Sequence, residues 1–219
     1  AWVPVIDAPP SPATGRRMLI DSAGPKRCPG ADPGVPMPLL NSVEGYGSLT
    51  KALHWLVAAL FAFQVVSALT MTRLGDDAAA ERDALYNWHK TLGLVALGVA
   101  VARLWARKAG ELPPWAPGLT TRDQRIVHHA ERALYLAMFV MPVSGFVYVM
   151  AGGYGVQFAG AFALPNPIGR WDLLAGGAKG IHITAAILLG VALMGHLGVV
   201  LRHTLVLRNG LIRRMLPGG

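Results

Sequence analysis

Charged residues and cysteine are scarce in this chain of 219 residues. Only 15% of the residues are charged while 53% are hydrophobic, and the mean hydropathy is +0.42. This composition argues against an ordinary water-soluble domain and indicates an integral membrane protein. The single cysteine, Cys28, excludes an internal disulfide framework, an iron–sulfur cluster held by several thiolates and a cysteine-rich zinc site. Any metal chemistry therefore depends on the seven histidines.

The first 45 residues lack apolar periodicity and contain nine prolines. A segment of this kind cannot build a core, so residues 1–45 are predicted to form an irregular Pro/Gly-rich arm. The segment also lacks the unbroken apolar stretch of a secretory signal peptide. Cys28 stands in "KRCPG", outside the small and apolar context of a lipoprotein site, so we expect an unmodified cytoplasmic thiol.

Four apolar stretches follow in residues 46–219, each close to the roughly 20 residues that cross the hydrocarbon of a bilayer. The sequence predicts an all-α fold, a four-helix transmembrane bundle preceded by the arm. Arg103 interrupts the second stretch, where its long side chain can extend toward the membrane surface. The expected helices are at about Ala52–Met71, Trp88–Ala106, Ala133–Ala151 and Ile181–Leu201.

The basic residues are distributed unevenly over the loops of this topology. Fifteen of the 20 Lys and Arg residues fall on the side that carries both termini, and five fall on the opposite side. Because cytoplasmic loops of membrane proteins are enriched in Lys and Arg, both termini are predicted to be cytoplasmic. The formal net charge of +8 is then explained by membrane topology, and it does not support nucleic-acid binding.

Four histidines in the predicted helices fall at two membrane depths. His182 and His196 are 14 residues apart, which corresponds to about 21 Å along a helix and nearly the same face. His89 can therefore meet His182 near the outer surface, and His54 can meet His196 near the inner one. Two facing imidazoles suit the axial positions of a six-coordinate b-type haem. The competing interpretation is that each histidine is an ordinary packed or interfacial residue.

Two basic residues are further candidates. Arg103 follows His89 by 14 residues, so its guanidinium can pair with a haem propionate at the inner level. Extension toward phospholipid is the alternative for Arg103. Lys179 precedes His182 by three residues and can attract an anionic substrate or a propionate to the outer site, with lipid anchoring as the alternative.

The remaining histidines and several glycines are open to more than one interpretation. His129 is expected to be a solvated interfacial residue, while His128 and His203 stay open as ligands, proton carriers or quinone contacts. Four glycines can admit a porphyrin or a neighbouring helix, although ordinary helix packing explains them as well. These are Gly93, Gly145, Gly190 and Gly195.

Five segments, in order, resemble the bacterial cytochrome b561 family over about residues 48–217. They are "LTKALHWLVAALF", "NWHKTLGLVAL", "RALYLAMFVMPVSGF", "AKGIHITAAILLGVALMGH" and "RNGLIRRMLPG". The resemblance implies a bacterial inner-membrane protein with two b haems, ligated by His54, His89, His182 and His196, that exchanges electrons with the quinone pool. Superoxide oxidation with ubiquinone as acceptor is an activity of similar proteins, and it would place Lys179 near the entrance.

The chain departs from the family pattern in its long arm and in Asn209, where an acidic residue is common. Three functions compete on this basis. The first is a stand-alone oxidoreductase between superoxide and quinone. The second is an electron-transfer or anchor subunit of a larger membrane complex, docked through residues 1–45. The third is a non-redox assembly or interaction protein with incidental histidines. Membrane lipid and quinone are the partners that the first two share.

Overall fold

The computed structural model of the protein describes residues 38–217. Four long α-helices account for most of this part, as the sequence predicts. A 3-10 turn, η1 (Asp76–Ala78), precedes the second helix, and the π-helical turn η2 (Arg202–Val206) and the 3-10 turn η3 (Leu211–Met215) follow the fourth. The four helices are α1 (Ser48–Met71), α2 (Ala79–Ala109), α3 (Thr121–Ala151) and α4 (Asp172–Leu201).

The helices end close to the predicted positions but begin earlier. Hydropathy detects only the apolar part of a helix, whereas backbone hydrogen bonding continues into polar turns. The start of α3 shows how such a turn is stabilised. Thr120 Oγ1 accepts a hydrogen bond from the Asp123 backbone N–H at 3.2 Å, and the Asp123 carboxylate accepts one from the Thr120 N–H at 3.3 Å. This capping box satisfies backbone groups that are left unpaired at a helix start.

Three of the helical segments in residues 38–217 are long and apolar enough to cross a membrane: α1, α3, and α4 extended through η2. The 31-residue helix α2 does not reach the same apolarity. Its span includes Lys90 and Arg103, and it ends in the basic residues Arg107 and Lys108. The described part of the chain is therefore a helical membrane protein in which one helix carries more charge than the others.

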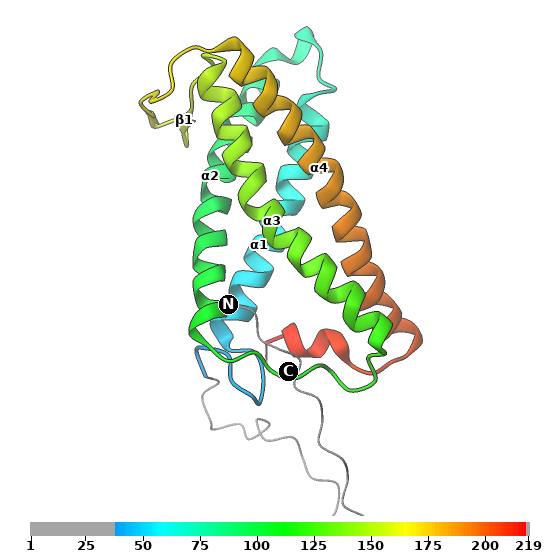
Figure 1. Cartoon of the computed structure of the whole chain (residues 1–219). Coiled ribbons are helices and arrows are strands. Elements are labelled where there is room, and N and C mark those ends of the chain that lie inside the picture. Colours follow the sequence, from blue (N-terminus) through cyan, green and yellow to red (C-terminus); the bar gives the residue numbers. More distant parts are fainter. Residues whose placement is uncertain (1–37, 218–219) are drawn as a thin grey trace, which may run out of the picture. The chain divides into compact units, whose positions relative to one another are not determined.

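The four helices run side by side (Figure 1). The most extensive packing is between α3 and α4, followed by that between α1 and α2. Small side chains occupy much of the interior, and Ala100, Ala106 and Ala151 are at most 1% exposed. Small residues let helix backbones approach closely in membrane bundles. Large apolar side chains such as Leu173 and Met194 face outward. This arrangement suits a hydrocarbon environment.

Loops close the bundle at its two ends. A short antiparallel hairpin of β1 (Gln157–Phe158) and β2 (Phe162–Ala163) lies between α3 and α4 at one end, while η3 lies at the other (Figure 1).

Residues 38–45, which the sequence assigns to the arm, contact the helices at the end that holds η3. Asn41 Oδ1 accepts from the Gly47 N–H at 3.0 Å, and its carbonyl accepts from the Glu111 N–H at 3.1 Å. The rest of the predicted arm, with Cys28, lies outside the described residues.

Candidate functional site

Two pairs of half-buried histidines face each other inside the bundle. His54 of α1 lies opposite His196 of α4, with ring centroids 6.3 Å apart and an interplanar angle of 57°. His89 of α2 lies opposite His182 of α4, with centroids 6.4 Å apart and an angle of 77°. Helix α4 thus supplies one imidazole to each pair, at two levels about 21 Å apart along its axis.

The separation of the rings is the one that a shared metal ion requires. A metal–imidazole bond is about 2.0 Å long. A ring nitrogen lies about 1.1 Å from the ring centre when the ring bonds are about 1.33 Å. Two imidazoles on opposite sides of one metal therefore have centroids about 6.2 Å apart. Both observed distances agree with this value.

The donor set at each level consists of imidazole alone. Within residues 38–217, no three or more His, Cys, Asp or Glu side chains gather into a metal site. Two imidazole nitrogens would hold a haem iron whose remaining donors come from the porphyrin, which is the donor set of a b-type haem. The residues present therefore fit a haem at each level better than a metal ion held by protein ligands only.

Hydroxyl and carbonyl oxygens surround the pair His89–His182, which is called the outer pair because the sequence predicts it near the outer surface. His89 Nδ1 lies 3.0 Å from Ser67 Oγ of α1, and His182 Nδ1 lies 2.9 Å from the Met141 carbonyl and 3.3 Å from Ser144 Oγ of α3. Gly145 follows Ser144, and a Cβ atom at its position would lie 3.0 Å from His182 Cε1. The imidazole of His182 thus occupies space that only a glycine at position 145 leaves open.

A guanidinium group contacts the pair His54–His196, which is called the inner pair because the sequence predicts it near the inner surface. Arg103 Nη2 lies 3.2 Å from His54 Nδ1, and Arg103 Nη1 is a buried donor with no hydrogen-bond partner among the described residues. Both Arg103 and Arg107 stack on the ring of Tyr135, at 5.8 and 5.4 Å from its centroid. Arg107 also forms an ion pair with Glu131. Glu131 offsets the charge of Arg107, so the positive charge beside His54 comes from Arg103.

Tyr46, just before α1, adds no negative charge to this region. Burial raises the pKa of its hydroxyl above the ordinary value, although the neighbouring Arg214 acts in the opposite direction. The phenol therefore stays neutral at physiological pH.

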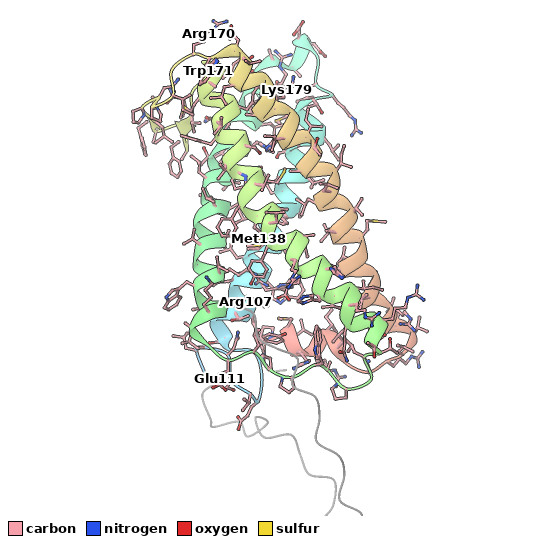
Figure 2. All side chains as sticks on the ribbon, viewed as in Figure 1. Arg107, Glu111, Met138, Arg170, Trp171 and Lys179 are labelled. Atoms are coloured by element: carbon pink, nitrogen blue, oxygen red, sulfur yellow. The ribbon has the colours of Figure 1, made fainter. Side chains whose placement is uncertain are left out.

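Lys179 lies near the start of α4, at the end of the bundle that also holds Arg170 and Trp171, whereas Arg107 and Glu111 lie at the opposite end (Figure 2). The Lys179 side chain is exposed, and its Nζ lies 5.9 Å from the centroid of the Tyr148 ring. In residues 38–217 Lys179 has neither a hydrogen bond nor an ion pair, whereas Arg170 pairs with Asp172 at 3.1 Å. Its charge is therefore available to an anion approaching that end of the bundle.

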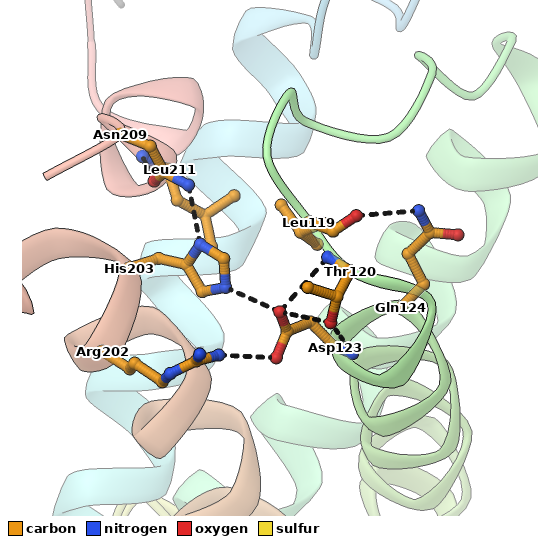
Figure 3. Close-up of polar contacts among 8 residues, drawn as sticks. All are labelled: Leu119, Thr120, Asp123, Gln124, Arg202, His203, Asn209 and Leu211. Carbon is orange, nitrogen blue, oxygen red and sulfur yellow. Dashed lines mark hydrogen bonds and ion pairs between the residues drawn. The ribbon is translucent and has the colours of Figure 1, made fainter. Parts of the chain in front are cut away.

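His203 lies in a separate polar cluster at the end of α4, shown in Figure 3. Its side chain is fully buried, and its Nε2 lies 3.3 Å from Asp123 Oδ2. The Asn209 amide lies 2.7 Å from His203 Nδ1, and Arg202 pairs with Asp123 at 2.9 Å. Because Asn209 Oδ1 accepts from the Leu211 N–H at 3.3 Å, its amide nitrogen is the atom that faces His203. The cluster joins the start of α3 to η2 and the following segment.

The other sequence candidates lie outside the two pairs. His128 and His129 are both exposed on α3, with ring centroids 5.9 Å apart. A Cβ on Gly93 would lie 3.2 Å from Gln64 Nε2, which marks a close approach of α1 and α2. A Cβ on Gly190 or Gly195 would meet no atom within 4 Å.

Sequence reasoning missed the residues that orient the histidines and the partners of His203. Ser67 and Ser144 carry no motif, and neither the capping box of Asp123 nor the departure from the family pattern at Asn209 indicates a contact with His203. A signal was nonetheless present for two of them, because a serine inside an apolar span is a candidate for a hydrogen bond between helices. The same reasoning does not reach the contacts of Asp123 with Arg202 and His203, which are 79 and 80 residues away in the sequence.

Comparison with known proteins gives two matches. A family model described as prokaryotic cytochrome b561 matches residues 45–218. The chain is also 28% identical over 188 residues to a protein of Escherichia coli (strain K12) described as cytochrome b561 homolog 2, covering 82% of this chain and 95% of that protein.

Proposed function

The chain belongs to the prokaryotic cytochrome b561 family, and from this premise we propose that it carries electrons through two b-type haems from an outer donor to the quinone pool. Family membership makes it a membrane b-type cytochrome of electron transfer. The observation that supports two haems is the pair of imidazole separations, 6.3 and 6.4 Å, each matching bis-histidine ligation. His54 and His196 would hold the inner haem, and His89 and His182 the outer one.

When bound, each haem supplies a one-electron reduction and oxidation of its iron. The protein fixes where these centres lie, because α4 spaces its two histidines about 21 Å apart along the helix axis. A bilayer's hydrocarbon is about 30 Å thick, so two centres divide a distance that is too long for one rapid electron-transfer step. Ligation, spacing and electrostatics are thus the functions of this chain's own residues.

Arg103 is proposed to bind a propionate of the inner haem. A guanidinium cannot give up its proton in a protein, so its Nη2 donates to His54 Nδ1. This contact opposes the histidine tautomer that ligates iron through Nε2. A haem carboxylate would attract the guanidinium away from His54 Nδ1 and provide an acceptor for the buried Nη1. Both the unpaired donor and the conflict at His54 support this assignment.

Lys179 is proposed to attract an anionic donor to the outer haem. It lies one turn before His182, and its ammonium is exposed. Superoxide fits this charge, and it gives up one electron to become dioxygen. Two superoxide ions would thus reduce one quinone, which takes up two electrons and two protons and becomes quinol. In this role Lys179 increases the local concentration of the donor rather than taking part in bond formation.

An apolar hollow of about 560 Å³ beside the inner pair suits the quinone. Its wall includes Trp55, whose ring lies edge-on to His54 with centroids 5.5 Å apart. Trp55 Nε1 donates to the Met215 carbonyl at 2.8 Å, which holds the ring against the C-terminal segment. The hollow is lined by Ser48, Lys51, Ala52, Trp55, Leu216 and Pro217.

The proposed location is the bacterial inner membrane with both termini in the cytoplasm. The excess of basic residues on the side of the inner pair supports this orientation. Quinone reduction would then take its protons from the cytoplasmic side. Docking of residues 1–45 on a larger membrane complex stays a prediction, because residues 1–37 lie outside the described part of the chain.

The test uses the purified protein in liposomes that contain ubiquinone. Superoxide generated outside should reduce the haems and yield one quinol for every two superoxide ions consumed. Lys179→Gln should slow this reduction and weaken its dependence on ionic strength, while Lys179→Arg should preserve both. Haems that quinol reduces but superoxide does not would eliminate superoxide as donor and retain the quinone link.

A further inference from the structure

Two buried serines contact the outer histidines from the two helices that do not supply those ligands. Ser67 of α1 is 2% exposed and Ser144 of α3 is 7% exposed. Their Oγ atoms lie 3.0 Å from His89 Nδ1 and 3.3 Å from His182 Nδ1. All four helices therefore take part at the outer level, two through imidazoles and two through hydroxyl groups.

The direction of these hydrogen bonds follows from the other contacts of the serines. Ser67 donates its hydroxyl proton to the Gln64 carbonyl at 3.1 Å, and Ser144 donates to the Val140 carbonyl at 2.6 Å. With its proton on that carbonyl, each serine oxygen can accept a hydrogen bond from the imidazole. Both histidines must carry their proton on Nδ1 to make these bonds.

The Met141 carbonyl, 2.9 Å from His182 Nδ1, gives the same result because a carbonyl only accepts. In the His182 ring the unprotonated nitrogen is therefore Nε2, and the same holds for His89 when Ser67 accepts from its Nδ1–H. This is the tautomer that binds a metal through Nε2.

The inner level lacks this arrangement. The polar neighbour of His54 Nδ1 is the Arg103 guanidinium at 3.2 Å, which is a cation and only a donor. In the described part of the chain, His196 has no hydrogen bond to its ring nitrogens. One level thus places neutral acceptors on the ligands and the other places a positive charge beside them.

We propose that Ser67 and Ser144 are positioning residues that fix the outer histidines as Nδ1–H donors and give the outer haem the lower reduction potential of the two. The proposal rests on the proposed function. An oxygen that accepts a hydrogen bond from Nδ1–H makes the imidazole a more basic ligand, and a more basic ligand favours oxidised iron. The positive charge of Arg103 favours the reduced iron at the inner level. Electrons therefore move from the outer haem to the inner one down the potential difference.

An alternative role for the serines is packing alone. Serine hydroxyls in membrane helices commonly bond to a carbonyl three or four residues earlier, and small side chains let helices approach. Thr70 of α1 makes the same hydroxyl-to-carbonyl hydrogen bond with no histidine contact, because its hydroxyl donates to the Val66 carbonyl at 2.8 Å. Thr70→Ala is therefore the matched control for loss of a hydroxyl from the same helix.

The experiment is a spectroelectrochemical titration of the full-length protein in detergent or nanodiscs. Ser67→Ala, Ser144→Ala and the double variant are compared with Thr70→Ala, and the outer haem is identified as the component that His182→Ala removes. Ser67→Ala should shift the reduction equilibrium of the outer haem severalfold toward the reduced form, and Ser144→Ala should shift it less because the Met141 carbonyl still accepts from His182. A tenfold shift equals 59 mV for one electron. The potential of the inner haem should not change.

Serine-to-threonine variants keep the oxygen acceptor and should retain the wild-type potential. Loss of the outer haem from the alanine variants, with its retention in the threonine variants, also supports the assignment. If the wild type binds two haems and the serine variants leave the reduction potential of the outer haem unchanged, this inference alone is overturned. A wild-type protein that binds no haem overturns the proposed function and the inference together.

Discussion

Replacing Gly145 with alanine places a methyl group against the His182 ring. The added Cβ would lie 3.0 Å from Cε1 and 3.2 Å from Nδ1, where ordinary contacts begin at 3.4 Å. The ring must therefore move by roughly 0.4 Å, whereas metal sites tolerate about 0.2 Å in ligand distance. The hydrogen bond of 2.9 Å from Nδ1 to the Met141 carbonyl resists such a movement.

The cost of this overpacking is about 1–3 kcal/mol. If this free-energy cost lowers the binding of the outer haem, its affinity decreases roughly fivefold to 150-fold. The assay is the amount of haem per chain after purification and dialysis against a haem acceptor, with the two haems distinguished by their spectra. We expect Gly145→Ala to lose the outer haem first and to retain the inner one.

The matched control is Gly98→Ala in α2. A Cβ at Gly98 meets no atom within 4 Å. Both substitutions replace a helical glycine by alanine and gain about 1 kcal/mol of helix propensity. They differ in the contact with His182, so Gly98→Ala should keep both haems. Full retention of the outer haem in Gly145→Ala, with an unchanged spectrum, would refute the assignment of His182 as a ligand held against Gly145.

Three further predictions concern the inner level, the His203 cluster and the outer surface. Arg103→Gln should lower the reduction potential of the inner haem by about 59 mV, a tenfold change in its reduction equilibrium, because a positive charge beside the iron is lost. Arg103→Lys should retain most of that potential, and an unchanged potential in Arg103→Gln would exclude an electrostatic role of Arg103. Asn209→Ala leaves the buried His203 Nδ1 without its partner at 2.7 Å. Thermal unfolding should therefore show a decrease of about 1–3 kcal/mol in the free energy of unfolding, with both haems retained. Loss of the inner haem would contradict the assignment of the His203 cluster as separate from the haem site. Lys179→Gln should leave the haem content and both reduction potentials unchanged. Loss of the outer haem in this variant would contradict the proposal that Lys179 only attracts the donor.

The sequence predicted the helices where one physical signal was sufficient. Runs of apolar residues about as long as a bilayer is thick identified the body of each helix, and the structure confirms a bundle of four long helices. The starts were placed too late because polar turns such as the one capped by Thr120 and Asp123 are helical without being apolar. The charge of α2 also lowers its apolarity below that of the other three helices.

The two predicted depths of the four histidines followed from the helix topology and from the spacing of His182 and His196. Fourteen residues complete nearly four turns, so His182 and His196 had to share a face. The polar partners of the rings did not follow, because they depend on which residues of neighbouring helices come into register. Ser67 and Ser144 are 77 residues apart in the sequence, and only the packing of α1 on α2 and of α3 on α4 places them at one level. The role of the histidines as haem ligands stays a prediction.

The amount of haem per chain tests the central claim most directly. Purified wild-type protein should contain two b-type haems for each polypeptide, with a reduced-minus-oxidised spectrum that resolves two components. His89→Ala or His182→Ala should each remove the outer component, and His54→Ala or His196→Ala the inner one. One haem in the wild type, or no haem, would contradict the account, as would histidine variants that lose neither component.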